Sequence, residues 1–552
     1  MGTLSNLWQN HRMLMVFVMI LIIVIPFLIF YLNKAKKEHP KGLIAAALSN
    51  MGERFGYYIM NAVLVLFICS KFGISDRLSG LIFGVFYFLI YVLALPGGII
   101  ADRTQNYKRT IICGIIVMAI GYGLLSIPVF SEGGGMSWPF VIAIVALLLI
   151  ACGNGLFKGN LQAIVGQLYD DFEAEAAKKG PEALAQAKEK RDSGFQIFYV
   201  FINIGGVIAP FVAPIIREWW LKTKGLVYNA DLPRLCHKFI MGTAEGNDMD
   251  NLTALTQGFP GASENLAGFC QNYIQVYNTG VHYSFIVSVV AMLISLFIFL
   301  AVKHKLPNPV KKVKAATQEY TEAERQADAK EIKQRMAALY AVLGIAVFFW
   351  LSFHQNAQSL SIFARDFVDT SALAPEILQF INPFFVIVLT PIVMWIFASL
   401  IRKGKEVSTP KKIALGMFIA ACAYLFLIVI AVVHNYPSDN AFKALPEAEK
   451  AAMKTGPWVM IVTYFFLTVA ELFISPLGLS FVSKIAPRHM VGMCQGLWLA
   501  ATAVGNLLIF LGVQMLESFP QQWMTWGVFA LICLTSMAIM FGMLKWLERV
   551  AK

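Results

Sequence analysis

Five ionisable side chains lie within stretches of this sequence that are otherwise apolar: Glu53, Arg54, Lys158, His354 and Glu471. A charged group is costly in the interior of a membrane, so such residues usually face an internal cavity or pair with one another. Carboxylates and amines placed together there could hold the charged ends of a small solute. A carboxylate or an imidazole could also carry a proton. The pattern therefore predicts a binding site inside a membrane protein.

The polar residues of the N-terminal half are spaced to share one helix face. Glu53, Tyr57 and Asn61 are four residues apart, and Arg54 and Tyr58 lie beside them. Residues at this spacing stack on the same side of a helix. A purely structural ion pair near the helix end is the alternative, but the two tyrosine hydroxyls favour a binding role.

Three further ionisable residues are isolated among apolar neighbours. Lys158 lies between Gly and Leu residues, too deep in its stretch to reach the membrane surface unless it is near the helix end. His354 follows Trp350 by one helical turn and could equally be a site residue or a hydrogen-bonded structural histidine. Glu471, with Ser475 one turn on, is a candidate for substrate binding or proton transfer.

The sequence contains no H-E-x-x-H, G-x-S-x-G or Walker motif. We therefore expect no enzyme activity, no metal site and no cofactor. A receptor would need a large signalling domain, which the loops do not offer. A passive channel would not need Glu and Lys residues in both halves.

Composition places these residues in a membrane. The chain has 552 residues, of which 58% are hydrophobic and 14% charged, whereas a soluble domain has roughly a quarter charged residues. About thirteen stretches approach the 20 apolar residues that cross a bilayer, so we predict an all-α integral membrane protein. They are 13–32, 43–70, 78–101, 109–128, 138–168, 195–216, 281–302, 337–357, 376–401, 411–434, 457–484, 490–515 and 522–547.

The net charge of +12 fits a lipid surface better than nucleic acid, because Lys and Arg cluster in alternate loops. Loops rich in Lys and Arg face the cytoplasm. This rule predicts a cytoplasmic C-terminus and an N-terminus outside. We expect a multi-pass protein of the plasma membrane, which in a bacterium is the inner membrane.

The stretches divide into two sets of six when the first one is set aside. The segment 303–336 separates the sets and is polar, so we expect a cytoplasmic amphipathic helix there. This is the plan of the major facilitator superfamily, in which the substrate lies between two rocking halves. The predicted parts are an extra N-terminal helix with a basic linker (1–42), helices 1–5 (43–216), an outside insertion (217–280), helix 6 (281–302), the linker (303–336) and a C-terminal six-helix bundle (337–552).

Two polar segments outside the spans receive separate predictions. The segment 171–194 is charged and helical in pattern, and we expect a cytoplasmic, solvated face without chemistry. The segment 217–280 is long for a loop and is expected to be a small cap or to be partly disordered. Its two cysteines, Cys236 and Cys270, could form a disulfide in an oxidising compartment, with two unpaired thiols as the alternative.

A set of short motifs runs through both halves of the chain. They are Glu53-Arg54-Phe55 with Tyr57-Tyr58, the segment 97–111 (GGIIADRTQNYKRTI), Lys158, Phe198-Tyr199 with Ile202-Asn203 and Gly205, Asn382-Pro383, Glu471 with 475–480, and Trp498 with Gly505-Asn506. Together and in this order they resemble the motifs of the proton-dependent oligopeptide transporter (POT) family. Only the first helix and the segment 217–280 lie outside the resemblance.

The resemblance implies proton-coupled import of di- and tripeptides by a monomer, with the peptide, protons and lipid as its partners. It implies that Arg54 and Lys158 hold the peptide carboxylate and that Glu471 holds the amino group. Further site residues that it implies are Tyr57, Tyr58, Asn61, Asn203, His354, Asn382 and Ser475, with Trp350 and Trp498 as walls. Gly98, Asp102 and Arg103 would belong to a gating loop, and Glu53, Lys158, His354 and Glu471 to proton coupling. Glu53 would be salt-bridged to Arg54 or Lys158 and would release that partner when protonated.

Three departures from the family pattern affect this expectation. Asn50 and His354 replace carboxylates that the family is thought to use in coupling and gating, and Asn61 replaces an Arg of many peptide carriers. Proton coupling is therefore expected to be weakened or moved to Glu53 and His354. A facilitator or symporter of another small solute, such as an anion or an amino-acid-like compound, is the alternative.

Overall fold

The computed structural model is helical almost throughout. It describes residues 2–551 with the exception of 75, 130–136, 230–231, 245–246, 260, 263, 308–321, 358, 370–380, 406, 444, 446–448, 450–451 and 488. The middle of the predicted linker, residues 308–321, thus lies outside the described residues.

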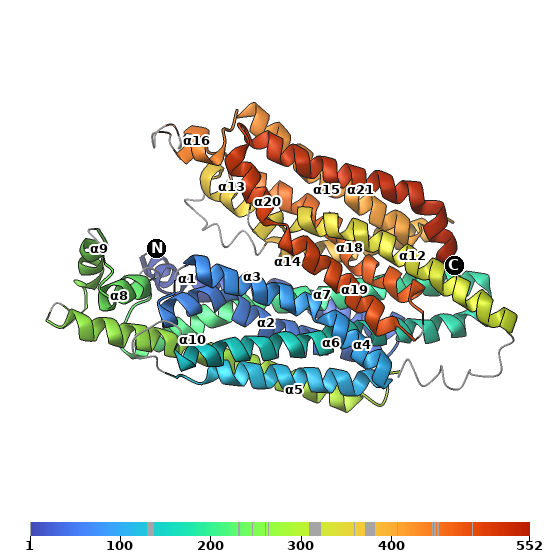
Figure 1. Cartoon of the computed structure of the whole chain (residues 1–552), viewed down its shortest axis with the longest axis horizontal. Coiled ribbons are helices and arrows are strands. Elements are labelled where there is room, and N and C mark those ends of the chain that lie inside the picture. Colours follow the sequence, from blue (N-terminus) through green and yellow to red (C-terminus); the bar gives the residue numbers. More distant parts are fainter. Residues whose placement is uncertain are drawn as a thin grey trace.

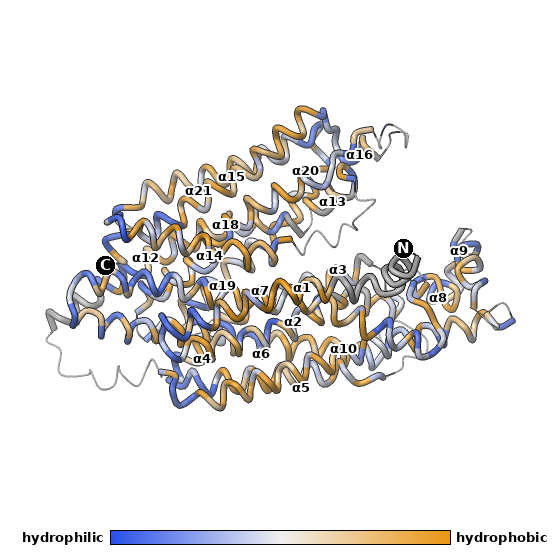
Figure 2. The backbone as a smooth tube through the Cα atoms, turned by 180° about the vertical axis from the view of Figure 1, so that it is seen from behind, coloured by the Kyte–Doolittle hydropathy of each residue, from blue (hydrophilic) through white to orange (hydrophobic). Residues whose placement is uncertain are grey.

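Twelve stretches of the described residues are long and apolar enough to cross a membrane. They are Phe17–Glu38, Leu81–Thr104, Tyr107–Ser126, Trp138–Ala177, Pro181–Thr223, Leu266–Val302, Lys330–Phe353, Ile381–Arg402, Thr409–Val433, Trp458–Ile485, Val491–Ser518 and Gln522–Val550. A further long helix, α2 (Gly42–Phe72), carries Glu53 and Arg54. In Figure 2 hydrophobic residues fill the middle of the helices, and hydrophilic residues gather near their ends.

The N-terminal bundle follows one long helix, α1 (Gly2–Glu38), which packs along the bundle. The helices of this bundle pair closely, α2 with α7 and α10, and α5 with α6. After α2 they are α3 (Asp76–Val92), α4 (Ala94–Thr104), α5 (Tyr107–Ser126), α6 (Trp138–Ala177), α7 (Pro181–Thr223) and α10 (Leu266–Val302).

The C-terminal bundle begins with a helix that does not run straight through. Helix α12 (Glu322–Phe353) gives way to a single 3-10 turn, η1 (His354–Ala357), and then to α13 (Ser359–Phe367). Trp350 and His354 are therefore not on one continuous α-helix as predicted. The remaining helices are α14 (Ile381–Arg402), α15 (Thr409–Val433), α16 (Asp439–Lys443), α18 (Trp458–Ile485), α19 (Val491–Leu507), α20 (Phe510–Ser518) and α21 (Gln522–Val550).

The predicted outside insertion is shorter than 217–280, because α7 runs on to Thr223 and α10 begins at Leu266. Between them lie two short helices, α8 (Leu232–Ile240) and α9 (Asn247–Thr256), which we call the cap. Helix α8 packs on the beginning of α10. The cap is therefore an ordered element beside the N-terminal bundle.

The two bundles meet mainly at one end. In Figure 1 they converge toward the end that carries the C-terminus and diverge toward the end that carries the cap. Helix α19 of the C-terminal bundle packs on α3, α4 and α6, while α14 and α18 pack on α7. We call the end near the C-terminus the closed end.

Candidate functional site

The carboxylate of Glu53 is bound within the N-terminal bundle. Arg54 donates from Nε and Nη2 to the two carboxylate oxygens, each at 2.5 Å. Asn154 of α6 donates to Oε1 at 2.6 Å. All three side chains are buried. Of the two partners that the sequence suggested for Glu53, the structure selects Arg54 and leaves Lys158 out.

Lys158 is buried on α6 without a carboxylate partner in the described part of the chain. Its Nζ lies 4.2 Å from the centre of the Tyr91 ring, which comes from α3. A cation over an aromatic face is attracted to it, but the ring does not neutralise its charge. Lys158 is thus a buried cation that an anionic ligand could bind.

Aromatic hydroxyls line the same region of the N-terminal bundle. Tyr57 donates to Oδ1 of Asn61 at 3.1 Å, and its ring meets the Tyr58 ring edge-on at 5.4 Å. Tyr58 and Tyr91 are both within electrostatic range of Arg54 and of Glu471 in the other bundle. Tyr58 and Tyr91 therefore lie near charged groups of both bundles.

Glu471 receives hydrogen bonds from both bundles. Tyr199 of α7 donates its hydroxyl to Oε1, and Asn382 of α14 donates to Oε2 at 2.7 Å. The same Asn382 amide also donates to Thr468 at 3.0 Å. Because Tyr199 belongs to the N-terminal bundle, the environment of Glu471 depends on how the bundles are placed.

The other predicted site residues surround these groups less directly. His354 stacks on Trp350 with ring centres 4.9 Å apart, and it lies within electrostatic range of Lys158. Trp498 is buried against Gly478, where a Cβ would meet the indole at 2.0 Å. Asn203 donates to the Tyr199 carbonyl of its own helix at 3.0 Å. Ser475 is buried one turn beyond Glu471.

Sequence reasoning did not include Tyr199, Asn154 or Thr468 among the site residues. Tyr199 stands four residues before Asn203, a spacing that could have placed it on the same helix face. Asn154 stands four residues before Lys158 and could have been found in the same way. Thr468 has no comparable signal, because a threonine in an apolar helix commonly bonds only to its own backbone.

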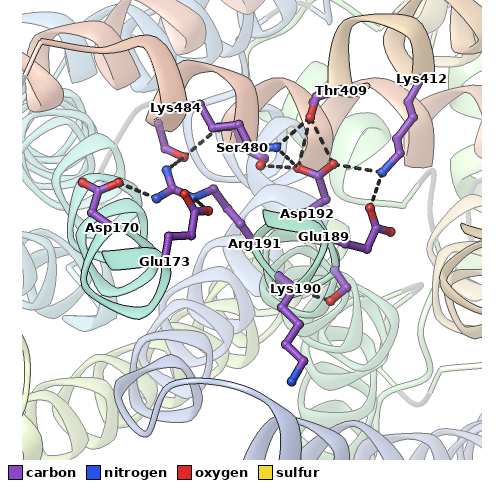
Figure 3. Close-up of polar contacts among 12 residues, drawn as sticks. Asp170, Glu173, Glu189, Lys190, Arg191, Asp192, Thr409, Lys412, Ser480 and Lys484 are labelled. Carbon is purple, nitrogen blue, oxygen red and sulfur yellow. Dashed lines mark hydrogen bonds and ion pairs between the residues drawn. The ribbon is translucent and has the colours of Figure 1, made fainter. Parts of the chain in front are cut away.

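A second buried cluster joins the bundles at the closed end and is drawn in Figure 3. Asp192 of α7 accepts hydrogen bonds from four residues of the C-terminal bundle. They are Thr409 at 3.1 Å, Lys412 at 3.0 Å, Ser480 at 2.6 Å and Lys484 at 2.8 Å. Lys412 also pairs with Glu189 at 2.8 Å. We call these six residues the Asp192 cluster.

Arg191, next to Asp192, makes a parallel set of contacts. Its guanidinium pairs with Asp170 and, at 2.7 Å, with Glu173, both on α6. It also donates to Ser483 of α18 at 3.3 Å. The prediction that segment 171–194 is a solvated face is therefore wrong for its last turns. Arg191 is buried against the carboxylates of α6, and Asp192 is buried because oppositely charged residues of α15 and α18 meet it.

The predicted gating segment also lies at the closed end. Asp102 accepts hydrogen bonds from the backbone N–H groups of Gly492 at 3.1 Å and Met493 at 2.8 Å, and from Tyr107. These two amides begin α19, and the first turn of a helix has unpaired N–H groups that attract a carboxylate. Gly98 touches Gly492 so closely that a Cβ would meet its carbonyl oxygen at 2.2 Å. Arg103 is exposed.

The family model described as the POT family matches residues 108–318 and 303–529 of this chain. The chain belongs to the POT family. The family membership predicted from the motifs is thus confirmed, and with it the predicted arrangement of membrane-spanning helices.

Named relatives match this chain over most of its length. Dipeptide and tripeptide permease B of Salmonella typhimurium is 28% identical, covering 93% of this chain and 96% of the permease. The same permease of Shigella dysenteriae is 27% identical with the same coverage. A solved POT family transporter in complex with a thioalcohol-conjugated peptide is 18% identical, with a TM-score of 0.57 over 94% of this chain and 98% of that one.

A cysteine of the cap lies against a cysteine of α10 in this POT chain. Cys236 on α8 and Cys270 on α10 are both fully buried and contact each other as free thiols. The contact with Cys270 and burial raise the pKa of the Cys236 thiol well above its usual range. The nucleophilic form of cysteine is the thiolate, so reduced Cys236 would react slowly with external reagents.

Proposed function

We propose that this POT chain imports di- and tripeptides across the plasma membrane by alternating access, coupled to protons. The observation that carries the proposal is Glu471, a buried carboxylate held by Tyr199 of one bundle and Asn382 of the other. A carboxylate in this position binds the peptide ammonium, and Lys158, which has no carboxylate partner among the described residues, binds the peptide carboxylate. The names of the permease relatives support the same substrate class.

The closed end faces the cytoplasm in this proposal, because the Lys- and Arg-rich loops and the C-terminus belong to that side. The bundles then seal the cytoplasmic end through the Asp192 cluster and through Asp102, and the peptide enters from the side of the cap. Transport requires these contacts to break as the bundles rock. Gly98 and Asp102 act as a gate because they hold α4 against α19.

Proton coupling in this proposal uses groups that change partners when the bundles move. Glu471 can exchange Tyr199 for a proton or for the peptide ammonium. His354, beside Trp350 and near Lys158, can change the charge that Lys158 experiences. Glu53 is neutralised by Arg54 and would release that partner on protonation.

The test is uptake of labelled alanyl-alanine into proteoliposomes containing the full chain as a purified monomer, with and without an inward pH gradient. We expect saturable uptake that the gradient drives above equilibrium, and inhibition by unlabelled tripeptide. Uptake that only equilibrates would identify a facilitator. Failure of both di- and tripeptides to enter or to compete, with uptake of a small anion or an amino acid instead, would refute the peptide proposal.

A further inference from the structure

The helix that precedes the two bundles, α1, contacts both of them. It packs along α7 of the N-terminal bundle and also touches α14 of the C-terminal bundle. Val24, Tyr31 and Ala35 form a buried face of this helix, whereas Ile22 is 65% exposed. A helix with one buried face is docked along that face. Helix α1 is therefore seated where the two bundles adjoin.

The contact with α14 is a specific hydrogen bond. The hydroxyl of Tyr31, which is fully buried, donates to the backbone carbonyl of Ile387 at 2.7 Å. In an α-helix this carbonyl would accept from the N–H four residues later, but that residue is Pro391. Proline has no backbone N–H, so α14 itself leaves the carbonyl without its helical partner. Tyr31 supplies the missing donor.

A missing donor matters more in a membrane than in water. The hydrocarbon offers nothing that could bond to a free carbonyl, and an unsatisfied backbone group there is strongly unfavourable. Tyr31 thus compensates a defect in α14 rather than merely attaching α1. Without it, α14 would have to shift, bend or admit water near Pro391 to satisfy the carbonyl.

This part of α14 also carries Asn382, five residues before Ile387. Asn382 holds Glu471 at 2.7 Å and Thr468 at 3.0 Å. The first turns of α14 are therefore fixed from two sides, by α18 through Asn382 and by α1 through Tyr31. A shift of α14 near Ile387 would move the Asn382 amide relative to the Glu471 carboxylate.

We infer that Tyr31 is a positioning residue for the substrate site: by completing the hydrogen bonding of α14 at Ile387, it keeps Asn382 on Glu471. The inference rests on the proposed function for the role of Glu471 in peptide binding. It gives the N-terminal helix a part in substrate affinity although none of the side chains described for that helix is assigned to the site.

The first test measures uptake of alanyl-alanine by the full chain carrying Tyr31→Phe. We expect the half-saturating concentration to rise about three- to tenfold, the change that corresponds to one lost hydrogen bond between membrane helices. The matched control is Tyr122→Phe on α5, a buried tyrosine whose hydroxyl has no hydrogen-bond partner among the described residues. That control should leave the half-saturating concentration unchanged.

Two double variants separate positioning from a general loss of stability. Pro391→Ala restores a backbone N–H opposite the Ile387 carbonyl, so Tyr31→Phe should have little effect in that background. Asn382→Ala removes the group through which Tyr31 acts, so adding Tyr31→Phe should change the half-saturating concentration less than twofold. If Tyr31→Phe raises the half-saturating concentration by the same factor in both backgrounds as in the wild type, the inference is overturned.

Hydrogen–deuterium exchange in lipid nanodiscs tests the same inference without a substrate. Proteolytic fragments of the protein that cover residues 381–402 should exchange faster in Tyr31→Phe than in the wild type. They should not do so in Tyr122→Phe or in the double variant Tyr31→Phe with Pro391→Ala. Unchanged exchange in Tyr31→Phe would contradict the role of Tyr31. If the wild-type protein takes up no peptide, the proposed function fails, and the exchange measurement still decides whether Tyr31 holds α14.

Discussion

Glu471 accepts hydrogen bonds from residues of both bundles. The change Glu471→Gln removes the charge, and one end of the new amide would face donors from Tyr199 and Asn382. We expect the affinity for dipeptide to fall at least about tenfold, since a hydrogen bond to a charged group contributes about 1.5–3 kcal/mol. Direct binding by calorimetry measures this.

The matched control is Glu517→Gln on α20, an exposed carboxylate far along the chain from the site. It should bind dipeptide like the wild type. Normal peptide affinity in Glu471→Gln would show that the substrate ammonium binds elsewhere.

His354 stacks on Trp350 and lies within electrostatic range of Lys158, where the gain of a proton would add a second positive charge. The change His354→Gln keeps a polar group of similar size against Trp350 but cannot gain a proton. We expect uptake to depend less on external pH. A pH profile identical to that of the wild type would assign coupling to Glu53 or Glu471 instead.

At the scale of elements, the cap contacts α10 through two buried thiols. We expect Cys236 and Cys270 to be oxidised to a disulfide in the native membrane, which closes a loop of 34 positions (270 minus 236). Chain-entropy arguments give a stabilisation of about 3–4 kcal/mol for a loop of this length. Mass spectrometry of protein alkylated after denaturation without reductant should find neither cysteine modified.

Denaturation is needed in that measurement because both cysteines are buried in the folded protein and would escape the reagent whether reduced or oxidised. Cys113, which is exposed on α5, serves as the control and should be alkylated throughout. Alkylation of both Cys236 and Cys270 would show that the cap is held by packing alone.

The elements differ in how far the sequence predicts them. A long apolar stretch can satisfy its backbone in a membrane only as a helix, so the spans follow from composition. The break after Phe353 could not be predicted, because His354 to Ala357 carries neither glycine nor proline. The burial of Arg191 and Asp192 was missed for a different reason. A charged helical turn looks the same in the sequence whether it faces water or pairs with another helix, as Arg191 does with α6 and Asp192 does with residues more than 200 positions along the chain.

The candidate site, like the helices, could be predicted from the sequence only in part. Motifs identified Glu53, Lys158 and Glu471, because a charge in an apolar helix is conspicuous whatever its partner. Partners depend on how the bundles are placed, which sequence spacing does not encode. The sequence therefore left open whether Glu53 pairs with Arg54 or Lys158, and it did not indicate that Tyr199 reaches Glu471 across the bundles.

At the scale of the whole molecule, the Asp192 cluster determines which end is shut. Asp192→Asn would leave Lys412 and Lys484 buried with less opposing charge. Removing one partner of a buried ion pair typically costs about 3–5 kcal/mol. We expect the variant to populate conformations in which the two bundles are separated at this end. Spin labels on α6 and α18 at that end should then lie farther apart than in the wild type.

The matched control for Asp192→Asn is Glu175→Gln, which breaks the exposed ion pair with Lys178 at the same end of the molecule. Exposed ion pairs contribute little to stability, so the distribution of distances between the spin labels should be the same as in the wild type. Equal distributions in Asp192→Asn and the wild type would mean that Asp102 and the glycine contacts suffice to hold the bundles together.

The glycine contact between α4 and α19 has an electrical consequence. Gly98 and Gly492 bring two backbones so close that not even a methyl group fits between them, and Gly496 lies as tightly against Ala94. No file of water molecules can pass through such a contact, so it should insulate the membrane against stray protons as long as this end is shut. A methyl group in Gly98→Ala would push the helices apart, and vesicles carrying that variant should dissipate an imposed proton gradient even when no peptide is present.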